Sequence, residues 1–307
     1  MTVRRIPKLL IVLALAASTS GCSVRRYAIN KIGDAIASGG STYESDDDIQ
    51  LVGEALPFGL KLIESLLAES PNHQGLLMAA CQGFTTYSYV YVQRDADRIA
   101  DDDIDAANAI RARALRLYLR AHRYGMRGLE VAHRGIGEQL QSNPSAAAAV
   151  LKKKDVPTVY WTAAALGSAI SLGRNDAALL ARLPEVQALL DRALELDEGW
   201  QNGALHEFEV IFASSRPGGA DYTEIQKHFD RAQQLSGGKH AALYVAFAEA
   251  VSVPKQDAAQ FRSMLEKALA INPDEQQDIR LVNLIAQERA KQLLNHIDDL
   301  ILEGDTQ

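Results

Sequence analysis

The chain has 307 residues, of which 47% are apolar and 23% are charged, and its formal net charge is −7. This composition is typical of a folded globular protein and excludes an intrinsically disordered chain. The acidic balance argues against nucleic acid as a partner and against a basic face that adheres to anionic lipid.

The first 21 residues have the three parts of a bacterial export signal. Arg4, Arg5 and Lys8 form a basic region, residues 9–17 are apolar, and residues 18–21 are small or hydroxylated. The apolar run is too short to span ~30 Å of hydrocarbon, which takes about 20 residues. We therefore expect residues 1–21 to be a removed signal peptide.

Cys22 follows directly, and the arrangement resembles a bacterial lipobox, with Thr19 where that motif prefers leucine. The resemblance implies cleavage before Cys22 and acylation of the cysteine, and removal of the signal changes the formal charge from −7 to −10. Two or three acyl chains anchor a protein stably, since each buried methylene adds about 0.8 kcal/mol. The alternative is a plain secretory signal with a chance cysteine. By resemblance to other lipoproteins, Ser23 implies the outer rather than the inner membrane, with the protein facing the periplasm.

Residues 22–48 are expected to form the lipidated N-terminal segment and tether, and residues 49–307 a single all-helical domain. Within the tether, Tyr27, Ile29, Ile32 and Ile36 suit one short helix. The Gly-, Ser- and Asp-rich stretch 38–48 suits a mobile or looped segment.

Helical periodicity extends over nearly all of the remaining chain, where apolar residues recur every three or four positions. Residues 85–92 are rich in β-forming residues but are predicted to be helical, because Phe84, Tyr87 and Tyr91 share a helix face and no second strand could pair with them. Residues 279–302 suit one long C-terminal helix. Prolines fall between these segments or at their first turns, which suits helix boundaries; they are Pro57, Pro71, Pro144, Pro157, Pro184, Pro217, Pro254 and Pro273.

Four similar phrases mark the ends of amphipathic helices, at residues 63–71, 190–198, 229–237 and 265–273. Successive offsets from Leu190 to Phe229 and on to Leu265 are 39 and 36 residues, close to the ~34-residue period of tetratricopeptide repeats. The sequence therefore predicts a degenerate tetratricopeptide-like solenoid of helix pairs. The first phrase is too far from the second for one repeat, so extra helices are expected between them.

Residues suited to catalysis or metal binding do not occur at the required spacings. His206 and Glu207 begin an HExxH pattern, but Val210 occupies the second histidine position. Residues 101–103 lack the glycine and the distal glutamate of a calcium loop and favour a solvated helix N-terminus. The sequence predicts no enzyme, no metal site and no cofactor. Cys81, in a helix-core context, is expected to be an inert buried thiol rather than a reactive one.

Two segments contain aromatic and polar residues that a generic solenoid does not need. In residues 155–167, Tyr160 and Trp161 are either core anchors, with Gly167 allowing a close helix crossing, or the wall of a ligand cavity. In residues 204–219, His206 and Glu207 are either a satisfied internal pair or functional, and Arg216 either binds an anion or partner or pairs with a carboxylate. The candidate ligand- or partner-binding residues are Tyr87, Tyr91, Tyr160, Trp161, His206, Phe208 and Arg216.

Five blocks of the sequence resemble the TatT family, the T component of tripartite ATP-independent periplasmic (TRAP) transporters. They are residues 113–130, 155–172, 188–219, 235–257 and 280–300. The resemblance implies an all-helical tetratricopeptide-like fold, a lipid anchor at Cys22, a homotrimer, and contact with the solute-binding P subunit. It also implies a hydrophobic pore or cavity in each protomer that passes or holds an apolar or organic-acid ligand.

The leading interpretation is a lipid-anchored, periplasm-facing protein that binds a solute-binding subunit and assists uptake, with a cavity that accepts a small ligand. The alternative is a tetratricopeptide-type scaffold in envelope assembly with no small ligand. A cavity within the helices would favour the first, and a solid core with only a surface groove would favour the second.

Overall fold

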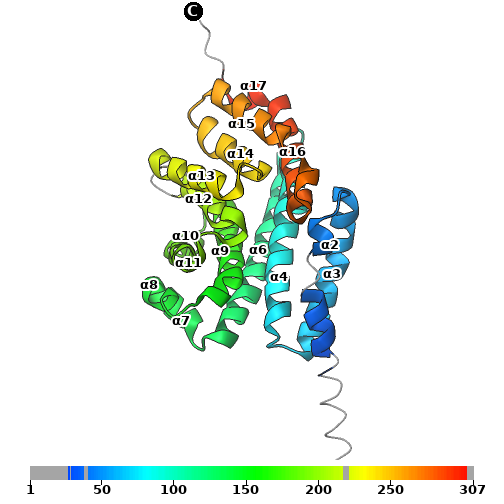
Figure 1. The fold of residues 1–307 in the computed structure, drawn as a ribbon, viewed down its shortest axis with the longest axis vertical. Coiled ribbons are helices and arrows are strands. Elements are labelled where there is room, and N and C mark those ends of the chain that lie inside the picture. Colours follow the sequence, from blue (N-terminus) through cyan, green and yellow to red (C-terminus); the bar gives the residue numbers. More distant parts are fainter. Residues whose placement is uncertain (1–26, 28, 38–40, 217–220, 303–307) are drawn as a thin grey trace, which may run out of the picture.

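Every regular element of the computed structural model is helical across the residues that it describes, which are 27, 29–37, 41–216 and 221–302 (Figure 1). This confirms the predicted all-α class. Within these ranges, no helix has both the length and the apolar character of a membrane span. The predictions for the signal peptide, Cys22 and Pro217 lie outside the described residues.

The N-terminal part is built from three mutually packed helices, α4, α6 and α9, with α3 covering α4. Its elements are α2 (Ser41–Glu44), α3 (Ile49–Glu69), α4 (Gln74–Tyr87), the π-helical segment η1 (Ser88–Gln93), α5 (Arg94–Ile99), α6 (Ile104–Ala132), α7 (Ile136–Ser142), α8 (Pro144–Ala148), the 3-10 turn η2 (Lys153–Asp155) and α9 (Val156–Leu172). Residues 29–37 are also helical, as predicted, and the Ser70 hydroxyl donates to Oδ1 of Asn30 over 2.7 Å.

The C-terminal part consists of antiparallel helix pairs, in which α12 packs on α13 and α14 packs on α15. Its elements are α10 (Ala177–Leu180), α11 (Leu183–Asp197), the 3-10 turn η3 (Trp200–Gly203), α12 (Ala204–Ser215), α13 (Tyr222–Ser236), α14 (Ala241–Phe247), the π-helical segment η4 (Ala248–Ser252), α15 (Ala258–Ala270), the 3-10 turns η5 (Pro273–Glu275) and η6 (Gln277–Ile279), α16 (Arg280–Asn295) and α17 (Ile297–Leu300). In Figure 1, α14–α17 stack at one end of the molecule.

The helices end where the four repeat phrases predict, since α3, α11, α13 and α15 finish at residues 69, 197, 236 and 270. Gly237 ends α13 in the left-handed region (φ 60°), where glycine carries no Cβ penalty. Aspartates begin several helices by accepting a backbone N–H, each worth about 1 kcal/mol. They are Asp48, Asp103, Asp176, Asp221 and Asp257. Asp103 confirms the helix N-terminus expected at residues 101–103.

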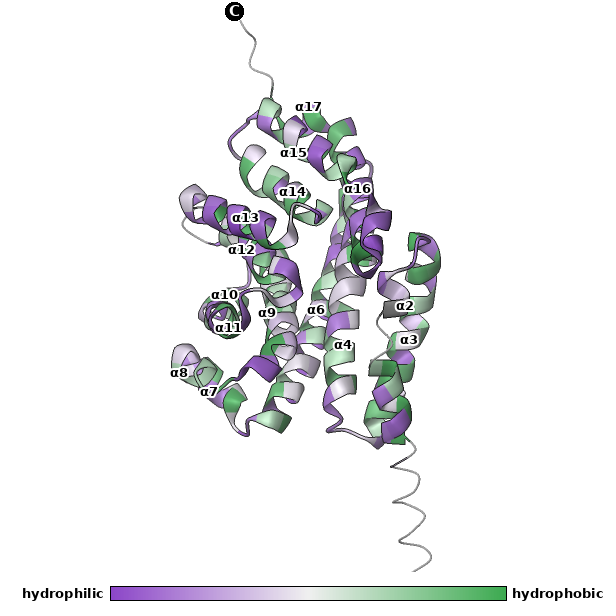
Figure 2. Ribbon diagram, viewed as in Figure 1, coloured by the Kyte–Doolittle hydropathy of each residue, from purple (hydrophilic) through white to green (hydrophobic). Residues whose placement is uncertain are grey.

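Buried apolar side chains form a core in each part of the molecule. Leu76, Leu77 and Cys81 of α4 are completely buried, and burial raises the pKa of the Cys81 thiol to about 12, which confirms the buried-thiol prediction. In the C-terminal part, Phe247 and Phe261 are 1% and 0% exposed. Figure 2 shows mainly hydrophilic residues on α13 and more apolar residues on α14. A buried helix such as α14 is apolar on most sides, whereas a helix at the surface keeps a polar face.

Three local predictions were wrong. Pro57 lies inside α3 rather than at a boundary, because Val52 and Leu60 on either side are buried and their packing outweighs the lost backbone hydrogen bond. Residues 41–44 form helix α2, not a loop, since α2 packs against α16. The C-terminal helix breaks at His296 (φ −113°, ψ 24°), so that α16 and α17 are separate.

The two parts of the molecule meet along α16. Val52 of α3 and Val90 of η1 share one apolar cluster with Leu281 and Ile285 of α16. Phe208 of α12 joins the apolar cluster of α9 and α11. These contacts place η1, α12, η4 and α16 around one region, where the candidate site lies.

Candidate functional site

Tyr89 of η1 has two properties that do not occur together on an open surface. Its side chain is 47% exposed. Yet burial among protein atoms raises the pKa of its hydroxyl to about 12, whereas a solvated tyrosine stays near 10. The ring is therefore accessible to solvent in a region where protein atoms crowd its hydroxyl.

Charged side chains from four further elements act on the Tyr89 hydroxyl. Glu249 of η4 and Glu207 of α12 raise its pKa further, while Arg289 of α16 and Arg94 of α5 oppose them. Helices from both parts of the molecule therefore supply polar groups to one region. We call Tyr89, Arg94, Glu207, His240, Glu249 and Arg289 the interlobe cluster.

Arg289 and Glu249 form the main ion pair of the interlobe cluster. Arg289 donates to Oε1 of Glu249 from Nη2 at 2.6 Å and from Nε at 3.1 Å. Burial disfavours the charged guanidinium, but Glu249 outweighs this and raises the pKa of Arg289. Their side chains remain 25% and 34% exposed, so the pair is accessible to solvent.

Both π-helical segments of the described chain contribute to this cluster. Tyr89 lies on η1 and Glu249 on η4. A π turn inserts one residue into a helix and changes the direction of the side chains that follow, and such turns recur at functional sites. Because Glu249 of η4 acts on Tyr89 of η1, the two π turns meet in one region, which we take as the candidate functional site.

His240 and Glu207 form a second polar pair in the cluster. Nδ1 of His240 lies 3.3 Å from Oε2 of Glu207, and their side chains are 12% and 20% exposed. Nε2 of His240 and Nε of Arg94 are buried without a hydrogen-bond partner among the described residues. Buried polar atoms are normally bonded, so these two nitrogens are available to a bound molecule or to water.

An aromatic wall formed by Tyr160, Trp161, Trp200 and Phe208 adjoins the cluster. The Tyr160 ring centroid lies 5.0 Å from that of Trp161, 4.6 Å from Trp200 and 6.1 Å from Phe208. Burial raises the pKa of Tyr160 far above its usual value, and Glu207 and Tyr89 add to this effect. Three residues predicted from the sequence are therefore brought together.

Gly167 allows the aromatic wall to form. A Cβ at this position would lie 2.9 Å from Cζ of Phe208, so only glycine lets α9 and α12 approach this closely. The close helix crossing expected at Gly167 is confirmed.

Tyr87 and Tyr91 are not members of the interlobe cluster, although burial raises the pKa of the Tyr91 hydroxyl and the nearby Arg94 of the cluster opposes this rise. The Tyr91 hydroxyl donates to the carbonyl of Ile49 over 2.9 Å, and its ring packs against Gly53. The Tyr87 ring lies 5.8 Å from Tyr91, and its hydroxyl accepts a bond from Arg113. These two tyrosines join α3, η1 and α6, which is a structural role.

His206 belongs to a separate polar chain that ties α12 to α13. Its Nε2 lies 3.1 Å from Oε1 of Glu198, and its Nδ1 lies 2.8 Å from Nδ1 of His228. Arg231 donates to both oxygens of Glu198. Because Glu207 pairs with His240 instead, the internal His206–Glu207 pair considered from the sequence does not form.

Arg216 pairs with carboxylates, one of the two alternatives drawn from the sequence. Nη2 of Arg216 donates to Oε2 of Glu209 over 2.9 Å, and Nη1 lies 3.4 Å from Glu224. Glu209 is 1% exposed, and burial raises the pKa of its carboxyl to about 7, with Arg216 opposing this rise. Arg216 therefore compensates a buried carboxylate.

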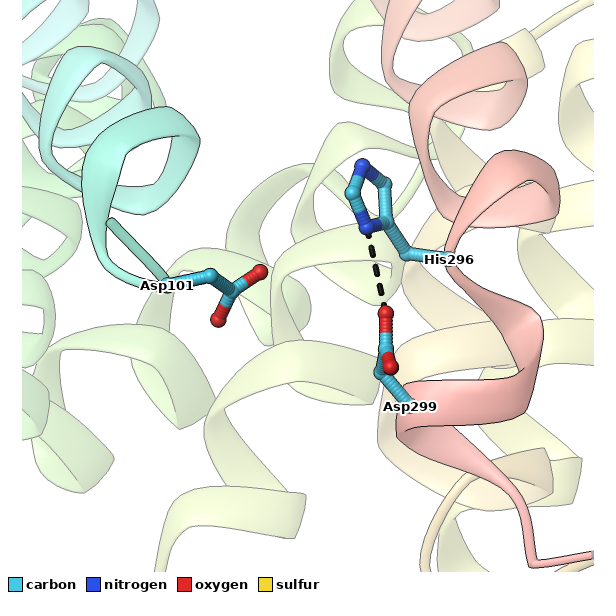
Figure 3. Close-up of side chains that lie close together, drawn as sticks. All are labelled: Asp101, His296 and Asp299. Atoms are coloured by element: carbon cyan, nitrogen blue, oxygen red, sulfur yellow. Dashed lines mark hydrogen bonds and ion pairs between the residues drawn. The ribbon is translucent and has the colours of Figure 1, made fainter.

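One exposed group has donor atoms close enough for a metal ion. Asp101, before α6, reaches towards His296 and Asp299, and the ligand atoms of all three lie within 4.8 Å of one another (Figure 3). Nδ1 of His296 lies 3.2 Å from Asp299. Water solvates such exposed groups without a metal, so we assign no metal-dependent function to them.

Sequence reasoning missed Tyr89, Arg94, His240, Glu249 and Arg289. Tyr89 stands two positions from both Tyr87 and Tyr91, hence on another helix face, and this offset was a usable signal. The other four are single charged or imidazole side chains without a local pattern. Only the fold brings them together.

Comparisons with known proteins span nearly all of the described chain. A family model described as TRAP transporter T-component matches residues 45–301. A protein of Treponema pallidum (strain Nichols), described only as an uncharacterized protein, is 26% identical over 304 residues, covering 92% of this chain and 94% of that protein.

Proposed function

This chain belongs to the TRAP transporter T-component family, and we propose that it is a lipid-anchored, periplasm-facing protein that binds the solute-binding subunit of a TRAP transporter. We further propose that it holds a small organic-acid or apolar ligand in the space lined by the interlobe cluster and the aromatic wall. Family membership makes it an accessory transport component. The subunit partner, the ligand and a homotrimeric assembly are the proposed additions.

The observation that carries the ligand proposal is the convergence of two polar pairs, Arg289–Glu249 and His240–Glu207, beside the exposed Tyr89 ring. Ligand sites combine an enclosed apolar wall with a few convergent polar groups. The aromatic wall and the Arg289–Glu249 and His240–Glu207 pairs supply both components.

The lipid anchor is proposed at Cys22, with residues 1–21 as the removed signal and residues 22–48 as the tether. The helical residues 29–37 begin seven positions after Cys22. An acylated Cys22 would therefore hold the body close to the membrane, and the outer membrane is the proposed location.

Chemical cross-linking in intact cells tests the partner proposal. The native chain is purified in detergent after cross-linking, and captured proteins are identified by mass spectrometry, with an unrelated outer-membrane lipoprotein as control. We expect the solute-binding subunit to be enriched with this chain alone. Enrichment of envelope-assembly proteins without that subunit would contradict the proposal and favour a scaffold.

Native mass spectrometry tests the ligand and the assembly. We expect a trimer that carries a copurifying small molecule. Tyr89→Trp, which enlarges the exposed ring of the interlobe cluster, should lose that molecule, whereas Tyr87→Trp, outside the cluster, should retain it. Equal retention by both variants would contradict the assigned site.

A further inference from the structure

The interlobe cluster contains guanidinium and carboxylate groups in equal number. The guanidinium groups belong to Arg94 and Arg289, and the carboxylates belong to Glu207 and Glu249. Arg289 pairs with Glu249, and Arg94 also lies 3.4 Å from the exposed Glu288 outside the cluster. The cluster itself therefore presents neither a net positive nor a net negative wall to Tyr89.

The Arg289–Glu249 pair has capacity for further hydrogen bonds. Both bonds from Arg289, through Nε and Nη2, end on the same oxygen, Oε1 of Glu249. Among the described residues, no hydrogen bond ends on Oε2 of Glu249 or begins at Nη1 of Arg289. A guanidinium can bind a carboxylate through two parallel N–H groups, so the pair can exchange or add a partner.

A ligand of single charge would fit this pair poorly. An anion that takes Arg289 from Glu249 leaves the carboxylate without its partner, and a cation on Glu249 leaves the guanidinium without its own. Both side chains are only partly exposed, so losing the charge-assisted hydrogen bonds between them disfavours either exchange. A molecule with both charges replaces each partner with one of the same sign, and no charge is left alone.

From this geometry we infer that the interlobe cluster binds a zwitterionic small molecule of the amino-acid type, with its carboxylate on Arg289 and its ammonium group on Glu249. The inference rests on the proposed function, in which this space holds a ligand, and narrows the ligand class. The accessible Tyr89 ring can contact the ammonium group as a cation–π partner. The aromatic wall of Tyr160, Trp161, Trp200 and Phe208 can receive the side chain.

Thermal shift and calorimetry on the mature chain test this inference with defined probes. The twenty standard amino acids are screened singly, and each one that binds is compared with its N-acetyl form, an anion, and its methyl ester, a cation. We expect at least one amino acid to bind, and both blocked forms to bind at least about tenfold more weakly, as the loss of a charge-assisted hydrogen bond implies.

Variants that remove one charge of the pair sharpen the test, because the two variants should favour opposite blocked forms. Glu249→Gln leaves a net positive pair and should bind the N-acetyl form better than wild type does, while Arg289→Gln should do the same for the methyl ester. Arg98→Gln, in an exposed ion pair with Asp95, is the matched control and should change neither preference. If a single substitution prevents folding, the exchanged double variant E249R/R289E keeps both charges and should still prefer the zwitterion.

Each outcome decides between the two proposals. An N-acetyl form that binds wild type as tightly as its parent amino acid overturns the zwitterion inference, while the ligand site stands. If no amino acid binds but succinate or palmitate, tested alongside, does bind, the zwitterion inference is also overturned and the ligand site also stands. If none of these probes binds and no small molecule copurifies, both the inference and the ligand proposal fail.

Discussion

His228 donates its Nδ1–H to Nδ1 of His206 across 2.8 Å, and this bond joins α13 to α12. The hydrogen-bond network assigns the protons, because Glu198 accepts from Nε2 of His206 and so leaves Nδ1 of that ring as an acceptor. A proton added to Nδ1 of His206 would place two hydrogens between the rings and break the bond.

The His206–His228 pair predicts a loss of stability in acid. Burial lowers the pKa of both imidazoles, and each also faces charged groups, Glu198 and Arg231 for His206, Glu224 and Arg216 among others for His228. As the pH falls through ~6.5, the unfolded chain binds these protons more readily than the native one, so the free energy of unfolding decreases.

Urea denaturation at pH 7.5, 6.5 and 5.5 measures this dependence. The double variant H206Q/H228Q should have a flatter dependence than wild type over that range. His296→Gln, at an exposed histidine, serves as the control and should follow wild type. A double variant that declines in parallel with wild type would show that the pair does not titrate as described.

Glu209 predicts a pH effect of opposite sign. Burial raises the pKa of its carboxyl to about 7, so the native state holds this proton where the unfolded state releases it. The stabilisation is complete below pH ~4.5 and is lost as the pH rises through 7. Between pH 5 and pH 8, the free energy of unfolding of Glu209→Gln should therefore rise relative to that of wild type by on the order of 2 kcal/mol, since one pKa unit corresponds to about 1.4 kcal/mol.

The same urea titrations measure the Glu209 effect, with Glu224→Gln as a matched control at the other carboxylate of Arg216. Glu224 is 39% exposed, so its replacement should shift the unfolding free energy little and evenly across the pH range. Parallel curves for wild type and Glu209→Gln would contradict the assigned pKa.

The fold was predictable where local signals agree with the packing. Pro71, Gly237 and Pro273 stop helices through backbone geometry alone, so the ends of α3, α13 and α15 could be predicted from the sequence. Pro57 does not follow this rule. Helix α3 continues past it because its buried side chains pack against side chains of other helices, and the local sequence does not show that packing.

The candidate site was predictable only in part. Tyr160, Trp161 and Phe208 belong to the two segments whose aromatic and polar residues a generic solenoid does not need, and that content identified them. The Arg289–Glu249 pair joins residues 40 positions apart. No local pattern relates two such residues, so the polar half of the site was missed.

Gly125 of α6 predicts a packing defect that can be measured. A Cβ there would clash with the Thr162 hydroxyl and lie 2.9 Å from Sγ of Cys81. Overpacking costs about 1–3 kcal/mol, and alanine recovers about 1 kcal/mol through helix propensity. We expect Gly125→Ala to lower the free energy of unfolding by about 1 kcal/mol.

Urea denaturation of Gly125→Ala beside Gly199→Ala isolates this packing term. No atom lies within 4 Å of a Cβ at Gly199, so that control should stay within about 0.5 kcal/mol of wild type. Equal stability of the two variants would mean that α6 can move away from Cys81 at no cost.

Cys22→Ser predicts a change of location without a change of fold. Serine lacks the thiol that the lipid would modify, and a chain without acyl groups has no strong membrane affinity. We expect a soluble periplasmic product or an unprocessed precursor, with the far-ultraviolet dichroism of the helical body unchanged. Cell fractionation with intact-mass measurement checks both points, and Cys81→Ala is the matched control because its thiol is buried in α4. Mature Cys22→Ser protein that still fractionates with membranes would contradict lipid anchoring at this residue, since the helices described here include no span that could retain it.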